Sequence, residues 1–242
     1  MAVPRVNLLF ISIFFFILSL SYKGRAGFIG PSPCPDLIFL LAGQSNMAGR
    51  GGVAKNGPWD GIVPPESQPT PSVLRLNVDL QWEVATEPLH RDIDNITLPS
   101  QHGIGPGLPF ATTLVNELGQ LVTVGLVPAA FSGSTIGQWQ RGQWLYSRLV
   151  ERATAATAFG SPITALLWFQ GESDTVAITS AIPGKSNASD VEVVRGIQFG
   201  LQLTNLKTVD SMGLAIGPDT VHLTTAAQVL LGRMLKEAYM LM

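Results

Sequence analysis

Short apolar β runs that alternate with helical patterns are the feature that most constrains what this chain can fold into. Expected strands cover residues 36–42, 73–76, 121–127 and 163–169, with a short segment at 81–83 after a turn, and expected helices cover 108–118, 144–158 and 225 to the end. This alternation is typical of a parallel sheet covered by helices on both faces. The last helix is expected to begin with a capping box formed by Thr225 and Gln228.

The first 26 residues have the pattern of a secretory signal peptide. Arg5 supplies a basic start, residues 8–20 form a nearly unbroken apolar run, and Gly24-Arg25-Ala26 fits a small-x-small cleavage site. The run is shorter than the ~20 apolar residues of an ordinary membrane span. An uncleaved signal anchor is the alternative. We predict cleavage near Ala26, a single secreted domain over 27–242, and no stable membrane insertion after cleavage.

Composition narrows the partners of the domain. Hydrophobic residues make up 46% and charged residues 13% of the chain, which favours a packed core over disorder. A net charge of −2 without a Lys/Arg stripe argues against nucleic acid as a partner. Sequons at Asn95 and Asn187 agree with secretion. Cys34 is the single cysteine and lies before the first strand, so neither an intramolecular disulfide nor a catalytic thiol is expected.

Ser45 directly follows the first expected strand, in the segment Gly43-Gln44-Ser45-Asn46-Met47. Open α/β sheets bind their ligands at the carboxyl ends of strands. A helix that starts here would supply free N–H groups to a developing oxyanion. Met47 replaces the second glycine of a G-x-S-x-G elbow, which disfavours an α/β-hydrolase. On position alone, Ser45 is as consistent with a helix cap as with a nucleophile.

A serine nucleophile needs a base, and the chain has three histidines. Asp219 stands three residues before His222, on a loop that precedes the last helix. Such an acid can turn back to the imidazole Nδ1–H and stabilise the imidazolium that forms when His222 accepts a proton. His90 and His102 are competing candidates for the base. His90 is interpreted either as part of a substrate pocket or as a solvated loop residue.

Two more segments follow expected strands and carry potential donors. Gly133 could bring a backbone N–H close to an oxyanion, and the Gln170 amide could donate a hydrogen bond without adding charge. The sequence has no His-Glu-x-x-His motif and no Cys/His cluster, so no metal site is predicted. Glu172 and Asp219 could be the carboxylate pair of a glycosidase, but that hypothesis leaves Ser45 and His222 unexplained.

Six segments, in order along the chain, resemble a known family. They are Gly43-Gln44-Ser45-Asn46-Met47-Ala48-Gly49-Arg50, Glu87-Pro88-Leu89-His90, Gly105-Pro106-Gly107, Ser132-Gly133-Ser134 with Gln138-Trp139, Trp168-Phe169-Gln170-Gly171-Glu172-Ser173-Asp174, and Asp219-Thr220-Val221-His222-Leu223-Thr224. Together they resemble the sialate O-acetylesterase-like carbohydrate esterases, which form carbohydrate esterase family 6 within the SGNH hydrolases. The similarity is greatest to the plant members and covers nearly the whole chain after residue 26.

The resemblance implies a flavodoxin-like α/β/α three-layer sandwich with a mainly parallel sheet. It implies removal of O-acetyl groups from carbohydrate, such as cell-wall polysaccharide or an acetylated sugar, with no organic cofactor and no metal. Ser45 would be the nucleophile, His222 the base and acid, and Asp219 its orienting partner. The oligomeric state is left open.

The resemblance also assigns an oxyanion hole to the Ser45 and Gly133 N–H groups and the Gln170 side chain. Candidate substrate contacts are Asn46, His90 and Glu172. Gln170 stands where many SGNH enzymes have Asn. Ser132 stands where Gly is expected, and a serine restricts the local turn.

One departure from the family pattern concerns the segment after Asp174. Val176–Ser180 resembles the family's fifth strand, but only Gln170–Thr175 separate it from the strand at 163–169. A parallel crossover needs roughly a dozen residues, whereas six extended residues span at most ~20 Å. We therefore predict a sheet that lacks one crossover helix, as in a splice variant or gene-model artefact. A catalytically impaired variant, a non-enzymatic carbohydrate-binding product and a lipid-directed SGNH esterase remain alternative hypotheses.

Overall fold

The structure, a computed structural model, describes residues 34–55, 57–94, 101–119, 121–158, 160–174 and 188–242. Its centre is a 5-stranded sheet in the order β3-β2-β4-β1-β5. The strands are β1 (Leu37–Gly43), β2 (Val73–Leu76), β3 (Trp82–Val84), β4 (Val124–Pro128) and β5 (Ile163–Phe169). All neighbouring pairs are parallel except β2 and β3, which are antiparallel. The predicted mainly parallel sheet is confirmed.

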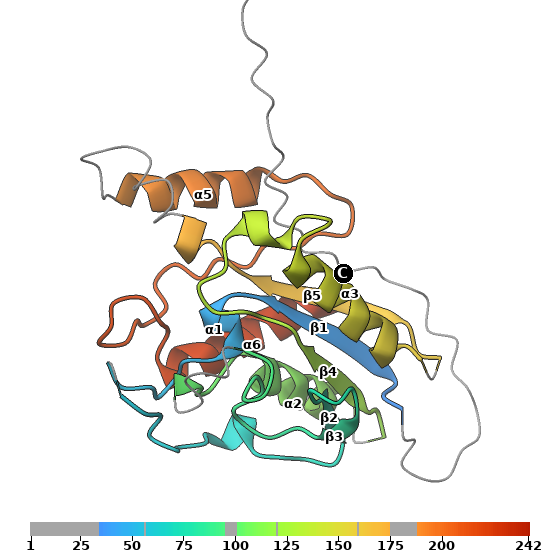
Figure 1. Cartoon of the computed structure of the whole chain (residues 1–242). Helices are drawn as coiled ribbons and strands as arrows, with labels where there is room; N and C mark the ends of the chain where they lie inside the picture. Colours follow the sequence, from blue (N-terminus) through green and yellow to red (C-terminus); the bar gives the residue numbers. More distant parts are fainter. Residues whose placement is uncertain (1–33, 56, 95–100, 120, 159, 175–187) are drawn as a thin grey trace, which may run out of the picture.

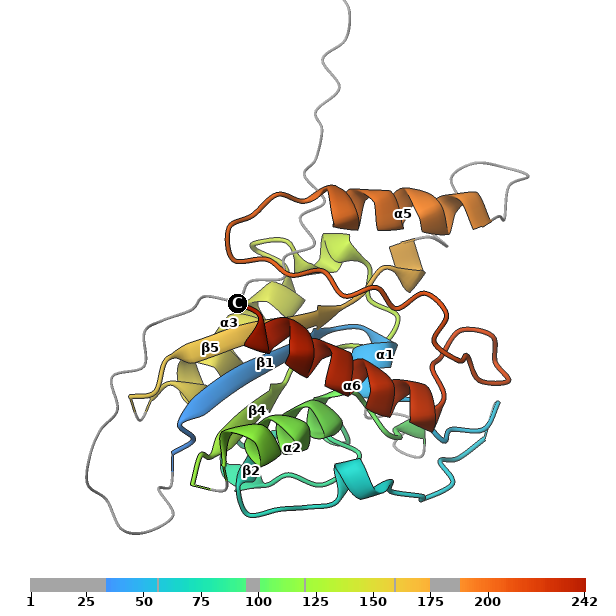
Figure 2. The same ribbon diagram turned by 180° about the vertical axis from the view of Figure 1, so that it is seen from behind.

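Helices cover both faces of the sheet (Figures 1 and 2). The helix α3 (Trp144–Ala156) lies on the face turned to the viewer in Figure 1. The helices α2 (Gly107–Leu118) and α6 (Thr225–Met240) lie side by side on the opposite face, shown in Figure 2. The predicted three-layer α/β/α sandwich is therefore confirmed.

The strand β1, which lies between β4 and β5, is buried on both faces because its neighbours and both helical layers cover it. Phe39 and Leu41 pack in the core toward α2 and α6, where Phe39 meets the rings of Phe110 at 4.8 Å and Tyr239 at 5.1 Å. Ile38 and Leu40 belong to a separate cluster on the α3 side. The alternation of a strand thus assigns successive side chains to opposite layers.

The predicted start of the third strand and the predicted cap of the last helix are wrong, and several other predicted bounds differ by one or two residues. The third predicted strand begins at Val124 rather than at residue 121, because Leu121 is 98% exposed beside a turn closed by Val122 N–H and the Gly119 carbonyl. The N-cap of α6 is Thr224, whose Oγ1 accepts from Ala227 N–H at 3.3 Å.

The remaining elements are α1 (Ser45–Ala48), α5 (Ala188–Gly200) and the 3-10 helices η1 (Pro65–Ser67) and η3 (Ile136–Trp139). The sequence pattern does not predict α5. Its apolar residues form no single stripe, and among residues 191–200 Val194 is the one buried side chain. The segment Val176–Ser180, the sequons at Asn95 and Asn187 and the signal sequence 1–26 lie outside the described residues. Within the described part of the chain, no helix is both long and apolar enough to cross a membrane.

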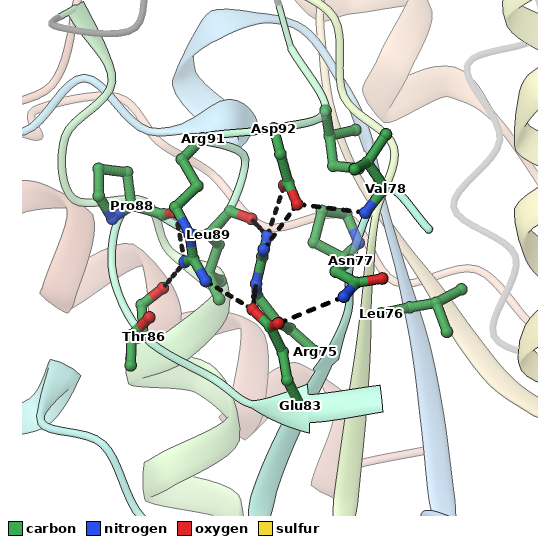
Figure 3. Close-up of polar contacts among 12 residues, drawn as sticks. Arg75, Leu76, Asn77, Val78, Glu83, Thr86, Pro88, Leu89, Arg91 and Asp92 are labelled. Atoms are coloured by element: carbon green, nitrogen blue, oxygen red, sulfur yellow. Dashed lines mark hydrogen bonds and ion pairs between the residues drawn. The ribbon is translucent and has the colours of Figure 1, made fainter. Parts of the chain in front are cut away.

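A buried arginine joins the antiparallel edge of the sheet to the loop that follows it (Figure 3). Arg75 of β2 is 1% exposed and donates to Glu83 of β3 at 2.8 Å, to both Asp92 oxygens at 2.7 Å and to the Leu89 carbonyl at 2.7 Å. A buried guanidinium needs such partners because an unpaired buried charge is strongly destabilising. The network fixes residues 87–92 against the sheet.

Candidate active site

The end of β1 determines where Ser45 lies. Gly43 has φ +122°, and a Cβ added there would lie 2.0 Å from the Phe169 carbonyl oxygen at the end of β5. Only glycine tolerates both this backbone conformation and this close approach. Gln44 N–H then donates to the same carbonyl at 2.9 Å, and α1 begins at Ser45. The predicted position of Ser45, at a strand end and the start of a helix, is confirmed.

Ser45, His222 and Asp219 form a continuous chain of hydrogen-bonding groups. Ser45 Oγ lies 2.8 Å from His222 Nε2, and His222 Nδ1 lies 2.6 Å from Asp219 Oδ2. The N-cap of α1 is Gln44, and no side chain caps this helix. The Ser45 hydroxyl is therefore not used as a cap, and the helix-cap interpretation is wrong.

The loop 217–223 holds Asp219 and His222 in this arrangement. Asp219 Oδ1 accepts from the N–H groups of Val221 at 3.0 Å and His222 at 2.9 Å. Gly217 N–H donates to the His222 carbonyl at 2.7 Å, and Thr220 adopts a left-handed φ of 66°. Although partial burial raises the pKa of Asp219, the two backbone N–H groups and the imidazole outweigh it and lower that pKa. Asp219 is thus a carboxylate at neutral pH.

Asn46 joins α1 to this loop. Its Oδ1 accepts from Leu223 N–H at 2.9 Å, and its Nδ2 donates to Glu172 at 2.7 Å and to the Val221 carbonyl at 3.4 Å. The Gln228 amide donates to the Asn46 carbonyl at 3.1 Å. Asn46 is 2% exposed with both ends of its amide occupied by protein groups. A contact between Asn46 and substrate stays a prediction. Because the Gln228 side chain binds the Asn46 carbonyl, it does not form the predicted cap of α6.

Glu172 lies beside α1 and near the imidazole. Burial raises the pKa of its carboxyl, and the Asn46 hydrogen bond and the charge of His222 oppose that rise without cancelling it. The segment that carries Glu172 is fixed by Gln44, whose Oε1 accepts from Gly171 N–H at 3.4 Å and Ser173 N–H at 3.2 Å. A contact between Glu172 and substrate stays a prediction.

Gly133 occupies a tight turn that follows β4. Ser134 N–H donates to the Phe131 carbonyl at 3.3 Å, and Gly133 has φ +72°. The positive φ falls at the third position of the turn, where glycine is favoured, and Ser132 fits the second position, which tolerates most residues. The Gly133 N–H has no hydrogen-bond acceptor among the described residues, and neither does the Ser45 N–H. Serine at position 132 is therefore compatible with the turn.

Gln170 is buried, but its amide is not free. Its Nε2 donates to the Ser134 carbonyl at 3.2 Å and to the Asp174 carboxylate. Both hydrogens of the amide nitrogen thus have acceptors. Asp174 in turn accepts from Ile136 N–H at 3.0 Å. Gln170 therefore presents no free N–H to an oxyanion in this arrangement, contrary to the expectation from the sequence.

The other two histidines lie away from solvent. His90 is 0% exposed, and burial lowers the pKa of its imidazole to about 3, so it is neutral. The interpretation of His90 as a solvated loop residue is wrong, and a contact between His90 and substrate stays a prediction. His102 is 2% exposed, and its Nε2 lies 3.3 Å from Asp94 Oδ2.

Asp94 belongs to a buried polar cluster that no sequence pattern indicates. Arg50 donates to Asp94 Oδ2 at 2.8 Å, and Ser132 donates to the two Asp94 oxygens from N–H at 2.7 Å and from Oγ at 2.5 Å. Burial would raise the pKa of Asp94, but His102, Arg50 and Ser132 together hold it well below its usual range. Asp94 lies in a loop without periodicity, so no local pattern could have identified it.

A cavity of about 490 Å³ opens beside the imidazole. Its lining includes Arg50, Asp60, Asp219, His222 and Thr225. A second cavity, of about 580 Å³, is lined by α3 and the turn after β2 and includes none of the predicted site residues. Across the described ranges, no three His, Cys, Asp or Glu side chains form a group that could hold a metal ion.

The sequence and the fold are both similar to those of known carbohydrate esterases. Residues 35–183 and 176–241 match the sequence model of a family described as carbohydrate esterase, sialic acid-specific acetylesterase. A probable carbohydrate esterase of Arabidopsis thaliana is 42% identical over 239 residues, which cover 85% of this chain and 91% of the relative. An Arabidopsis thaliana crystal structure superposes with a TM-score of 0.76 at 41% identity, over 85% of this chain and 98% of the other. The crystal structure of NanS shares the fold, with a TM-score of 0.62 at 16% identity, over 86% of this chain and 98% of the other.

Proposed function

The chain belongs to the carbohydrate esterase family of sialic acid-specific acetylesterases, and on that premise we propose that it hydrolyses acetyl esters of carbohydrate with Ser45 as nucleophile. The observation that carries the proposal is the chain of contacts from Ser45 Oγ to His222 Nε2 at 2.8 Å and from His222 Nδ1 to Asp219 at 2.6 Å. A nucleophile, a base and an acid that orients the base are the three groups that acyl transfer to serine requires.

In the proposed reaction, Ser45 Oγ attacks the acetyl carbonyl carbon and His222 Nε2 accepts the hydroxyl proton. The tetrahedral intermediate then collapses, the carbon–oxygen bond to the sugar breaks, and His222 gives its proton to the departing sugar oxygen. Water attacks the acetyl-enzyme in the same manner and releases acetate. Asp219 keeps the imidazole in the correct tautomer and stabilises the imidazolium formed in each half-reaction.

The N–H groups of Ser45 and Gly133 are proposed to bind the oxyanion of the tetrahedral intermediate. Donors aimed at the developing charge contribute a large share of catalysis in acyl transfer. Gln170 would supply a third donor only if its amide turned away from Asp174. A two-donor oxyanion hole is therefore the arrangement that the described contacts support.

The test is hydrolysis of 4-nitrophenyl acetate and of an O-acetylated polysaccharide. Ser45→Ala is expected to abolish turnover, while Ser147→Ala, on an exposed turn of α3, is expected to behave like wild type. A fluorophosphonate should label wild type and not Ser45→Ala. Turnover that survives in Ser45→Ala would refute the mechanism, and faster turnover of long-chain than of acetyl esters would favour the lipid-directed alternative.

A second candidate, a catalytically impaired or merely carbohydrate-binding product, has two observations in its favour. Gln170 has its amide occupied by Asp174 and Ser134, and the two family matches overlap at 176–183, just after the shortened segment. Cooperative unfolding together with stoichiometric fluorophosphonate labelling would exclude it. A folded protein that binds the polysaccharide but is not labelled would support it.

Secretion is the corresponding proposal for localisation. Residues 1–26 would direct export and be removed near Ala26, and Asn95 and Asn187 would accept glycans. Expression in a secretory host, N-terminal sequencing of the secreted protein and the gel shifts of Asn95→Gln and Asn187→Gln test this. Retention of the intact N-terminus in a membrane fraction would instead indicate a signal anchor.

A further inference from the structure

The buried carboxylate of Asp94 links the two segments that supply the proposed oxyanion donors. On one side, Gly49 N–H donates to the Ser45 carbonyl at 2.9 Å, and Arg50 donates to the Gly49 carbonyl at 2.9 Å and to Asp94 at 2.8 Å. On the other side, Ser132, the residue before Gly133, binds Asp94 through its N–H and its hydroxyl. The side chains of Arg50 and Asp94 are 10% and 0% exposed, so this ion pair is almost completely excluded from solvent.

Asp94 affects the position of Gly133 through Ser132, the residue that precedes Gly133 and binds Asp94. The N–H groups of Ser132 and Gly133 are consecutive in one turn, so either of them could donate to the Asp94 carboxylate. Asp94 takes the first of them at 2.7 Å, which fixes the orientation of the peptide before Ser132, and leaves the Gly133 N–H without an acceptor among the described residues. Ser132 Oγ also accepts a hydrogen bond from Arg50. Ser132 thus makes two hydrogen bonds to Asp94 and one to Arg50, which belongs to the segment that carries Ser45.

We propose that Asp94 is a positioning residue that holds the Gly133 N–H in register with the Ser45 N–H, so that both donors address one oxyanion. This inference rests on the proposed esterase function. Asp94 does not contact substrate in this scheme, and its effect passes through Ser132. Displacement of a catalytic donor by about 1 Å is enough to cost a reaction about 10²-fold.

The test compares two carboxylates that each pair with an arginine: Asp94 is buried, whereas Asp92 is half-buried. Asp94→Asn keeps the shape of the side chain but removes the charge and one acceptor facing Arg50 and Ser132. Asp92→Asn makes the same change in the Arg75 network (Figure 3), away from Gly133. We expect kcat for 4-nitrophenyl acetate to fall about 30- to 100-fold in Asp94→Asn with KM within about twofold of wild type. We expect Asp92→Asn to lower the unfolding midpoint and to leave kcat within about twofold.

A second measurement separates positioning from loss of structure. A boronic acid that becomes a tetrahedral anion on Ser45 should lose affinity in Asp94→Asn in proportion to kcat, because it uses the same two donors. Equal kcat losses in Asp94→Asn and Asp92→Asn that follow their unfolding midpoints would overturn the proposal, as would an unchanged kcat in a folded Asp94→Asn protein.

Ser132→Ala keeps the test open if Asp94→Asn fails to fold. It removes the hydroxyl but leaves the N–H bond to Asp94 and the Arg50 ion pair. We expect a three- to tenfold fall in kcat and an unchanged KM from Ser132→Ala alone. Where Asp94→Asn folds, the double variant should be no slower than Asp94→Asn, because both changes act on one path. A wild-type rate in Ser132→Ala, or additive losses in the double variant, would contradict the proposal. An inactive wild-type protein would instead refute the esterase function itself.

Discussion

Asn46 Oδ1 accepts a hydrogen bond from Leu223 N–H at 2.9 Å across a sequence separation of 177 residues. The same amide donates to the Val221 carbonyl, so Asn46 contacts the chain on both sides of His222. The residue after the proposed nucleophile therefore holds the backbone that carries the proposed base.

We predict that Asn46→Asp damages catalysis more than stability. Asp keeps the acceptor for Leu223 N–H but places a second carboxylate against Glu172, 2.7 Å from the present nitrogen. His222 would shift relative to Ser45, and kcat for an aryl acetate should fall about 10²-fold. Steady-state kinetics and urea unfolding, with the exposed Asn116→Asp as control, measure the two effects. A wild-type kcat in Asn46→Asp would contradict the role assigned to Asn46.

Asp219→Asn tests the orientation of the imidazole. The carboxylate accepts from Nδ1 at 2.6 Å and from two backbone N–H groups at its other oxygen. An amide can keep the backbone contacts yet favours the wrong imidazole tautomer, so kcat should fall about 10³- to 10⁴-fold. Because backbone N–H groups and the imidazole lower the pKa of Asp219, wild type should keep this carboxylate charged to a lower pH than an ordinary aspartate. Fluorophosphonate labelling rates should fall in parallel, and an unaffected rate would remove Asp219 from the mechanism.

Gly43→Ala should prevent or severely weaken folding. The new methyl group would lie 2.0 Å from the Phe169 carbonyl at a φ of +122°, which adds a backbone clash to conformational strain of about 1–3 kcal/mol. Gly142→Ala is the matched control, because Gly142 also has a positive φ of +93° but has no atom within 4 Å of the added Cβ. Denaturant unfolding should show a loss of at least ~3 kcal/mol for Gly43→Ala and ~1 kcal/mol for Gly142→Ala. Equal losses would show that the approach of β5 is not what requires glycine.

Glu87→Gln should change how stability depends on pH. Burial raises the pKa of Glu87 from 4.5 to about 8, and its Oε2 accepts from Leu89 N–H at 2.9 Å. Between these values the folded protein holds a proton that the unfolded chain has lost. The contribution of Glu87 is therefore complete below about pH 4.5 and declines as pH rises to about 8, with a limiting slope of ~1.4 kcal/mol per pH unit.

Glutamine cannot ionise, so Glu87→Gln should gain stability relative to wild type across that same interval. Urea unfolding from pH 4.5 to 8.5 measures the difference, with the exposed Glu117→Gln as control. A difference between wild type and Glu87→Gln that stays constant with pH would show that the carboxyl is ionised in the folded protein.

The parts of the site that could be predicted from sequence are those encoded by short local patterns. An apolar run that ends in glycine gave the place of Ser45, and an acid three residues before a histidine gave the pairing of Asp219 with His222. Both patterns depend on residues that are neighbours in sequence. The same holds for β1, β2 and β5, whose apolar runs are continuous and bounded by turn residues.

Other parts of the site depend on contacts between distant segments. Asp174 and Ser134 bind the amide of Gln170. Three separate segments contact Asn46. Asp94 meets its partners only when the loops that carry them come together in the folded protein. No propensity or spacing encodes these outcomes. The helix α5 was missed for a related reason: with Val194 as the one buried side chain among residues 191–200, it lacks the apolar stripe by which a helix is identified.

The separation of Ser45 from His222 by 177 residues has a consequence for biosynthesis. The serine emerges from the ribosome early, whereas the histidine emerges just before the final helix. A nascent or C-terminally truncated polypeptide therefore holds an unactivated alcohol. Under the proposed mechanism, a chain that ends before His222 is therefore expected to lack esterase activity even though it contains Ser45.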